Sequence, residues 1–370
     1  MRILPRYVLK EFLTPVFYCI VAFASLHVVF ELFGEFDKII AAKPAPGLVL
    51  RYICGHLAKD MQWLLTPSLM LGGLYAMWQL ARHGEITAMR ASGIGFASIT
   101  APIMAAAVVF ALVVLFLGEF YIPAAIRDAE AIKMSGFKSG TATLLREVHF
   151  NNVVGRRDWQ AGSFDVATAT LENVKVSWTD DEGYIGQTLT ADRAVFRDGA
   201  WWFDNAEMTT FVHQKGASAQ VATNRGSRSL LVMPELDERP RDFEIEYGLQ
   251  GQNASIESLT SGDMRRYLAM RPNLEGADRR TWVYEMVNRY AAPLACIFIT
   301  LFAIPAGVAT GRQSVFMGVV SAILLFIGYY AFSLVCGVLS KGGTFPVWFG
   351  IFLPNIVIFV AGLWLFRRQR

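Results

Sequence analysis

The chain has 370 residues, of which 54% are hydrophobic and 18% are charged, and its mean hydropathy is +0.37. Soluble globular proteins carry about 25% charged residues, so this composition argues against a soluble protein. The net charge of +3 is too small to indicate a nucleic-acid partner. The four cysteines and five histidines follow no metal-ligand spacing, which leaves neither a zinc site nor a histidine-based catalytic centre visible.

Three long apolar runs occupy the first third of the chain. They cover residues 12–33, 61–81 and 99–121, and each is close to the ~20 residues that cross the hydrocarbon of a bilayer. The ten residues before the first run are polar and basic, but no small-residue cleavage site follows the run. The sequence therefore predicts a retained membrane helix rather than a signal peptide.

The middle of the chain, residues 122–280, has no spanning run and favours strands. Val174, Val176 and Trp178 alternate with polar residues, which places their side chains on one face of a strand. Asp198 and Gly199 separate two such segments and predict a tight hairpin turn. This part indicates a β-sandwich, jelly roll or open barrel, followed by a short amphipathic helix over residues 258–270.

Three more apolar runs follow, at residues 286–308, 315–339 and 347–366. With the N-terminus inside, the short inner segments carry nine Lys and Arg residues and the outer loops carry five. The positive-inside rule then favours cytoplasmic N- and C-termini and a translocated β domain. Four of the outer basic residues lie between the first two runs, in an interfacial loop or in a region that attracts an anionic lipid.

Three motifs in this order resemble the lipopolysaccharide-export permeases LptF and LptG (the YjgP/YjgQ family). They are RYVLKEF at residues 6–12, ARHGEITAMRASGI at 81–94 and RYAAPLA at 289–295. The resemblance covers the whole chain. It implies a polytopic α-helical membrane protein with six transmembrane helices, three plus three, around a periplasmic β-jellyroll. The implied divisions are residues 1–121, with a cytoplasmic coupling helix near 82–94, then 122–256 for the jellyroll, 257–285 for a linker helix and 286–370.

The resemblance also implies a function in outer-membrane biogenesis. LptF and LptG form a heterodimer above an LptB-like ATPase dimer, and LptC and LptA-like jellyroll proteins continue the path. The assembly takes lipopolysaccharide from the outer leaflet of the bacterial inner membrane. No GxxxxGK[ST] phosphate loop is present here, so ATP and Mg²⁺ are expected in the partner ATPase and no cofactor in this chain. The sequence does not distinguish an LptF-like from an LptG-like chain.

The resemblance singles out candidate residues for two tasks, coupling to the ATPase and contact with the lipid. For coupling they are Arg82, Glu85, Arg90 and Gly93, with a solvated interfacial turn as the alternative. Candidate contacts to lipid phosphates are Lys38, Lys43, Arg265, Arg266 and Arg289. The alternative for the two lysines is an ordinary interfacial loop, and the alternative for the three arginines is charge neutralisation of the preceding domain. Candidate cavity-lining residues are Phe30, Phe33, Phe316, Phe326 and Tyr330, whose alternative is helix packing or lipid contact.

One position departs from the family pattern. Some LptG members carry a lysine in the last turn of the first helix, and Glu31 occupies that place here. Glu31 could pair with a basic residue of the sibling subunit, or the chain could be the other paralogue.

Two other functions compete with transport. A membrane hydrolase or ligase would need a nucleophile, base or metal constellation, and the chain has no GxSxG or HExxH motif. A mechanotransmission or scaffold protein would share this topology without carrying lipid. An apolar groove in the β domain would favour transport, whereas a closed core would favour the scaffold.

Overall fold

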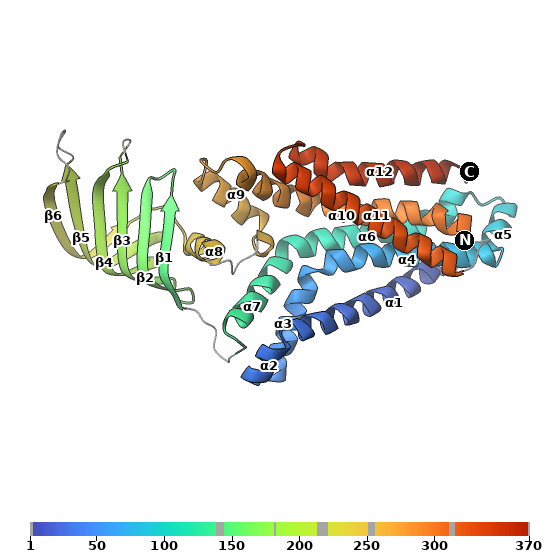
Figure 1. Ribbon diagram of the computed structural model, residues 1–370, viewed down its shortest axis with the longest axis horizontal. Helices are drawn as coiled ribbons and strands as arrows, with labels where there is room; N and C mark the ends of the chain where they lie inside the picture. The colour runs from blue at the N-terminus through green and yellow to red at the C-terminus, as the bar shows by residue number, and fades with distance from the viewer. Residues whose placement is uncertain are drawn as a thin grey trace. The chain divides into compact units, whose positions relative to one another are not determined.

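The computed structural model describes residues 3–137, 144–180, 183–212, 221–250, 256–310 and 315–368. The chain forms two compact units (Figure 1). The helical unit comprises Met1–Ala129 and Gly276–Arg370, and the β unit comprises Glu130–Glu275.

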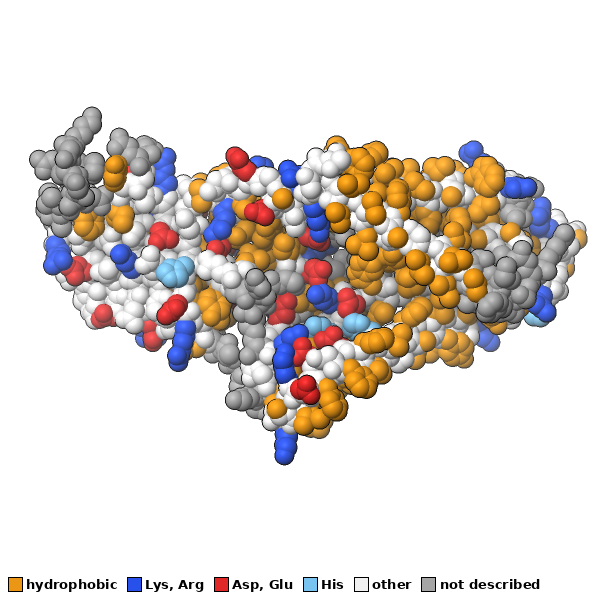
Figure 2. All heavy atoms as spheres, viewed as in Figure 1, with side chains coloured by type: hydrophobic (Ala, Val, Ile, Leu, Met, Phe, Trp, Pro, Cys, Tyr) orange, Lys and Arg blue, Asp and Glu red, His pale blue; other side chains and the backbone are white. Residues whose placement is uncertain are grey.

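The helical unit is built from long helices and short connecting ones. Its helices are α1 (Ile3–Gly34), α2 (Phe36–Ala42), α3 (Pro46–Lys59), α4 (Met61–Arg82), α5 (Glu85–Ala91), α6 (Phe96–Phe120), α10 (Gly276–Thr310), α11 (Val315–Gly342) and α12 (Val347–Arg368). Helix α7 (Ile122–Met134) follows α6 directly and crosses the boundary between the units. Hydrophobic side chains cover much of the helical unit on the face shown in Figure 2.

Five helices among the described residues are long and apolar enough to cross a membrane. They are α1, α6, α10, α12 and residues Ile323–Gly342 of α11. Helix α4 is long enough, but it carries polar residues such as Thr66 and Ser68, and both are buried. These polar groups face protein, because α4 packs between α1 and α10, and the Ser68 hydroxyl donates to the carbonyl of Leu64 at 2.6 Å. The predicted six spans are therefore not confirmed, and a sixth crossing by α4 stays a prediction.

Helix α1 packs on α4 through its N-terminal half only. Val8, Phe12 and Val16 are fully buried. A Cβ atom at Gly72 of α4 would lie 2.9 Å from the backbone nitrogen of Val16, so the glycine allows the two backbones to approach closely. Further along, Phe30 and other apolar side chains of α1 are exposed. The apolar packing of α1 against α4 is therefore concentrated in its first half.

The described residues of the β unit form one antiparallel sheet in which consecutive strands are neighbours. Its elements are β1 (Leu144–Asn152), β2 (Arg157–Asp165), β3 (Thr170–Thr179), β4 (Ile185–Arg197), β5 (Ala200–Val212), β6 (Val221–Met233), α8 (Pro240–Gln250), η1 (Ile256–Ser258) and α9 (Ser261–Met270). The predicted hairpin is confirmed, because Arg197 pairs with Ala200 and both Asp198 and Gly199 have positive φ, as a type I′ turn requires.

One face of the sheet carries the core of the β unit. Val174 and Val176 are buried there and Trp178 packs against them, as the alternation predicts. Phe243 of α8 packs between Trp159 and Trp201, with ring centroids 5.2 and 5.7 Å away. A jellyroll would interleave strands from two sheets, whereas the described strands form one sheet of successive hairpins. The jellyroll is therefore not confirmed. The helix predicted over 258–270 is α9, whose N-terminus is closed by a capping box between Thr260 and Asp263.

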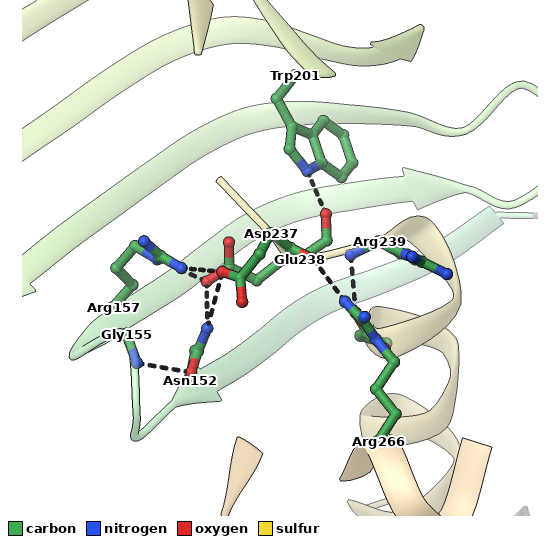
Figure 3. A network of polar contacts seen from close by, with 9 residues as sticks. Asn152, Gly155, Arg157, Trp201, Asp237, Glu238, Arg239 and Arg266 are labelled. Atoms are coloured by element: carbon green, nitrogen blue, oxygen red, sulfur yellow. Dashed lines mark hydrogen bonds and ion pairs between the residues drawn. The ribbon is translucent and has the colours of Figure 1, made fainter. Parts of the chain in front are cut away.

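A buried polar network ties the β1–β2 turn to the segment before α8 (Figure 3). Glu238 is fully buried, and its Oε1 accepts hydrogen bonds from Arg157 Nε and Asn152 Nδ2, each at 2.7 Å. The Trp201 indole donates to the Glu238 carbonyl at 2.8 Å, and Arg157 also pairs with Asp237. The network holds two segments about eighty residues apart in sequence against the same edge of the core.

Candidate functional site

The segment between α4 and α6 forms a helix of seven residues, α5, with defined ends. Helix α5 begins after Gly84, whose φ of 73° only glycine adopts without strain. At the other end Gly93 has a φ of 86°. Its N–H donates to the carbonyl of Arg90 at 3.0 Å, and the N–H of Ile94 donates to the carbonyl of Met89 at 3.1 Å. This pair of bonds is a Schellman motif, so Gly93 is the residue that ends α5.

Two apolar side chains attach α5 to the helical bundle. Ile86 and Met89 are buried, and they belong to the same core cluster as Val8 of α1, Leu80 of α4 and Phe96 of α6. The residues on the opposite side of α5 are exposed. A displacement of α5 would therefore be passed to the helices on which it packs.

Polar side chains at the start of α5 have partners inside the chain. The Tyr7 hydroxyl of α1 donates to Glu85 Oε1 at 3.0 Å. Glu85 lies in the first turn of α5, where the helix dipole favours a negative charge. The Arg82 guanidinium lies 5.1 Å from the centre of the Trp78 ring, in cation–π geometry. Arg90 is exposed near the end of α5.

A second polar group joins the C-terminal end of α1 to α3. Glu31 accepts a hydrogen bond from the Tyr52 hydroxyl at 2.5 Å, and the His56 Nδ1 lies 3.4 Å from the same oxygen. Burial and the Glu31 carboxylate raise the pKa of Tyr52 above its usual range, because ionisation would place two negative charges together. One helical turn earlier, His27 pairs with Asp60 at 3.4 Å.

The sequence comparison bears on the role of these features. The family model described as "Lipopolysaccharide export system permease LptF/LptG" matches residues 6–368. The chain belongs to the LptF/LptG family. The resemblance drawn from the three motifs is therefore confirmed. The family is a component of lipopolysaccharide transport and is not known as an enzyme. A comparison with curated proteins returns no match.

The four coupling candidates of this LptF/LptG chain lie in or beside α5. Glu85 and Arg90 are in the helix, Arg82 precedes it, and Gly93 ends it. The structure brings them together in one ordered segment, in which Glu85 and Arg82 each have a defined contact. Their role in coupling stays a prediction, and so does the alternative of a solvated interfacial turn.

The five basic candidates have different environments. Lys38 pairs with the buried Glu35 at 2.7 Å, and Lys43, in left-handed conformation at the end of α2, borders an apolar groove between α2 and α3. Arg289 is mostly buried, 3.8 Å from Glu119. In the β unit Arg266 is held by Asp242 at 3.0 Å, whereas Arg265 is exposed. The hydrogen bonds to Asp242 raise the pKa of Arg266.

The aromatic candidates are divided between exposed and packed positions. Phe30 and Phe33 are 68% and 73% exposed. Phe326 packs on Tyr330, with ring centroids 4.4 Å apart, and Tyr330 stacks on Trp63 at 4.5 Å. The side chain of Phe316 lies outside the described residues. The structure places no common cavity around the described members of this set, so the lining role stays a prediction.

Sequence reasoning missed the partners of the two carboxylates. Within the chain Glu31 contacts Tyr52 and His56, and neither a basic partner in a sibling subunit nor the assignment to the other paralogue is tested. Tyr7 belongs to the RYVLKEF motif, which by itself indicates no partner for its hydroxyl. Its spacing of 78 residues from Glu85 leaves no local signal of their contact.

Proposed function

We propose that this chain is the permease subunit of an ATP-driven lipopolysaccharide extractor. It pairs with a sibling permease above an LptB-like ATPase dimer and takes the lipid from the outer leaflet of the inner membrane. The β unit then lies in the periplasm and passes the lipid to LptC and LptA-like proteins. The alternative is a scaffold that transmits ATPase motion without carrying lipid.

Helix α5 carries this proposal. It is short, its buried side chains belong to one core cluster with residues of α1, α4 and α6, and its opposite side is exposed. Removing a multi-acyl lipid from a bilayer costs about 0.8 kcal/mol for each CH₂ group that loses its apolar surroundings. An external energy source and a point where force enters the helices are therefore both needed. An exposed helix anchored to three others supplies such a point.

The replacement of Glu85 by alanine tests the coupling role. Glu85→Ala should abolish lipopolysaccharide release or prevent ATPase assembly, because the carboxylate that meets the ATPase is gone, while membrane insertion is retained. The measurement is lipid release from proteoliposomes together with co-purification of the ATPase. Glu235→Ala, which removes an exposed carboxylate outside α5, is the matched control and should behave as wild type. Wild-type lipid export by the Glu85→Ala variant would contradict the coupling role.

The packed core of the β unit favours the scaffold as a second candidate. Trp159, Trp201, Phe203 and Phe243 are each no more than 1% exposed. These rings fill the space between the sheet and α8, so a lipid chain would have to follow another part of the apolar face. Strand β6 offers one, because Leu231 packs against the core while remaining partly exposed.

Photocrosslinking separates the two candidates. A crosslinking side chain at Leu231 faces the core side of β6, and one at the adjacent Leu230 faces the opposite side, where Leu230 is 50% exposed. Transport predicts lipopolysaccharide adducts at 231 during ATP turnover and fewer at 230. Adducts to protein alone at both positions would support the scaffold.

A further inference from the structure

The hydrogen bond between Tyr7 and Glu85 connects the first helix of the chain to α5. The donor and acceptor lie 3.0 Å apart and 78 residues apart in sequence. Tyr7 is the next residue to Val8, which is fully buried in the cluster that also holds Ile86 and Met89. The packing of Val8 therefore fixes the backbone at Tyr7 relative to α5. Tyr7 as a residue is 38% exposed, and its hydrogen bond to Glu85 lies near the surface.

A glutamate side chain at a docking surface is costly to order. Fixing its rotamers takes up to about 2 kcal/mol of conformational entropy, and this cost weakens any complex that requires one orientation. An ionised carboxylate has about four acceptor sites, of which Tyr7 occupies one. The remaining sites are open to donors of a partner, while the side chain is held in place before the partner arrives.

We infer that Tyr7 is a positioning residue: its hydroxyl pre-orients the Glu85 carboxylate for the ATPase and makes α1 respond directly to that contact. The inference rests on the proposed coupling role of Glu85. Helix α1 is the suitable receiver, since its N-terminal half packs on α4 and its remaining length is largely exposed. A shift of the Glu85 carboxylate would act on α1 through this bond as well as through the apolar contacts of α5.

Tyr7→Phe removes only the hydroxyl and is the direct test. In the reconstituted permease pair, we expect about 2- to 10-fold weaker ATPase binding, the range for loss of one partly exposed hydrogen bond. Binding would be measured by titration of the purified ATPase onto nanodiscs. Tyr18→Phe, which removes a hydroxyl from an exposed tyrosine of the same helix, is the control and should bind as wild type.

A double-mutant cycle separates positioning from a general structural role. In a Glu85→Ala background, titrated to ATPase concentrations high enough to reach the weakened binding, Tyr7→Phe should cause no further loss of affinity, because the acceptor is already absent. A loss of the same size in both backgrounds would overturn the inference, and so would wild-type affinity of Tyr7→Phe alone. The thermal unfolding of Tyr7→Phe should match that of Tyr18→Phe, since neither hydroxyl is part of the buried core.

The failure of this inference differs from a failure of the coupling role. If Glu85→Ala abolishes lipid release and Tyr7→Phe is silent, only the positioning role is wrong. If Glu85→Ala itself binds the ATPase and exports lipid as wild type does, the coupling role and the positioning role both fall.

Discussion

In the β unit and in the helical unit alike, a carboxylate is contacted by side chains distant in sequence, but the two carboxylates are buried to different degrees. In the β unit Glu238 is fully buried and Arg157 is 13% exposed. At the C-terminal end of α1, Glu31 and His56 are 22% and 18% exposed. A fully buried pair is costly to break, because the surviving charge cannot be solvated, whereas a partly exposed group regains water. The buried pair in the β unit therefore stabilises the fold, whereas the partly exposed contact at the end of α1 can break and form again at lower cost.

The largest expected effect comes from breaking the buried pair. Arg157→Ala leaves the Glu238 carboxylate buried without its neutralising partner, which should cost the β unit about 3–5 kcal/mol of stability. The measurement is hydrogen-exchange protection of the β1 and β2 amides in the full-length protein, which reports the free energy of opening this edge of the sheet.

A salt bridge on the surface of the same sheet provides the control. Arg225 and Glu207 lie 2.7 Å apart, but they are 75% and 41% exposed. Arg225→Ala should lower stability by less than about 1 kcal/mol, because water screens and replaces the contact. If the two arginine variants lost equal stability, the depth of the charges would not explain the difference between the two regions.

Features that depend on local pattern could be predicted from the sequence. Uninterrupted apolar runs located the spans, and the turn residues Asp198 and Gly199 located a hairpin. Helix α4 shows the limit of hydropathy as a criterion for membrane spans. A helix that packs between other helices can carry buried polar residues such as Thr66 and Ser68, and these lower its mean hydropathy. The strand pattern left a β-sandwich, a jelly roll and an open barrel as alternatives, and only the family resemblance singled out the jellyroll, which the one sheet of described strands does not confirm.

The polar contacts could not be predicted for a different reason. Arg157 and Glu238 are 81 residues apart, and their pairing depends on how the segment before α8 crosses the end of β2. Glu31 was recognisable as an anomaly, because an acid stood where the family often has a lysine. Its partners were not recognisable, since Tyr52 and His56 lie in the segment between two apolar runs that the sequence indicated only as an outer loop. The sequence pattern locates an unusual charge, but only the tertiary packing shows which groups contact it.

A much smaller effect than that of Arg157→Ala is expected for the partly exposed cluster. Tyr52→Phe removes the hydrogen bond to Glu31 and should lower the stability of the α1–α3 contact by about 1 kcal/mol at neutral pH. The effect should also depend on pH. The pKa of Tyr52 is raised in the folded protein, whereas an unfolded tyrosine titrates near about 10. The stabilisation is therefore complete below about pH 10 and declines as the pH rises above that value.

Hydrogen exchange of the α3 amides between about pH 7 and 11, corrected for intrinsic exchange rates, would measure this dependence. Tyr121→Phe, at an exposed tyrosine after α6, is the matched control and should keep the wild-type pH profile. The wild-type protein should lose α3 protection above about pH 10 more steeply than Tyr52→Phe, because only the wild type has a phenol to ionise there. Parallel profiles would mean that Glu31 is held by His56 alone. A loss at neutral pH as large as that of Arg157→Ala would mean that this end of α1 is as rigidly fixed as the β unit.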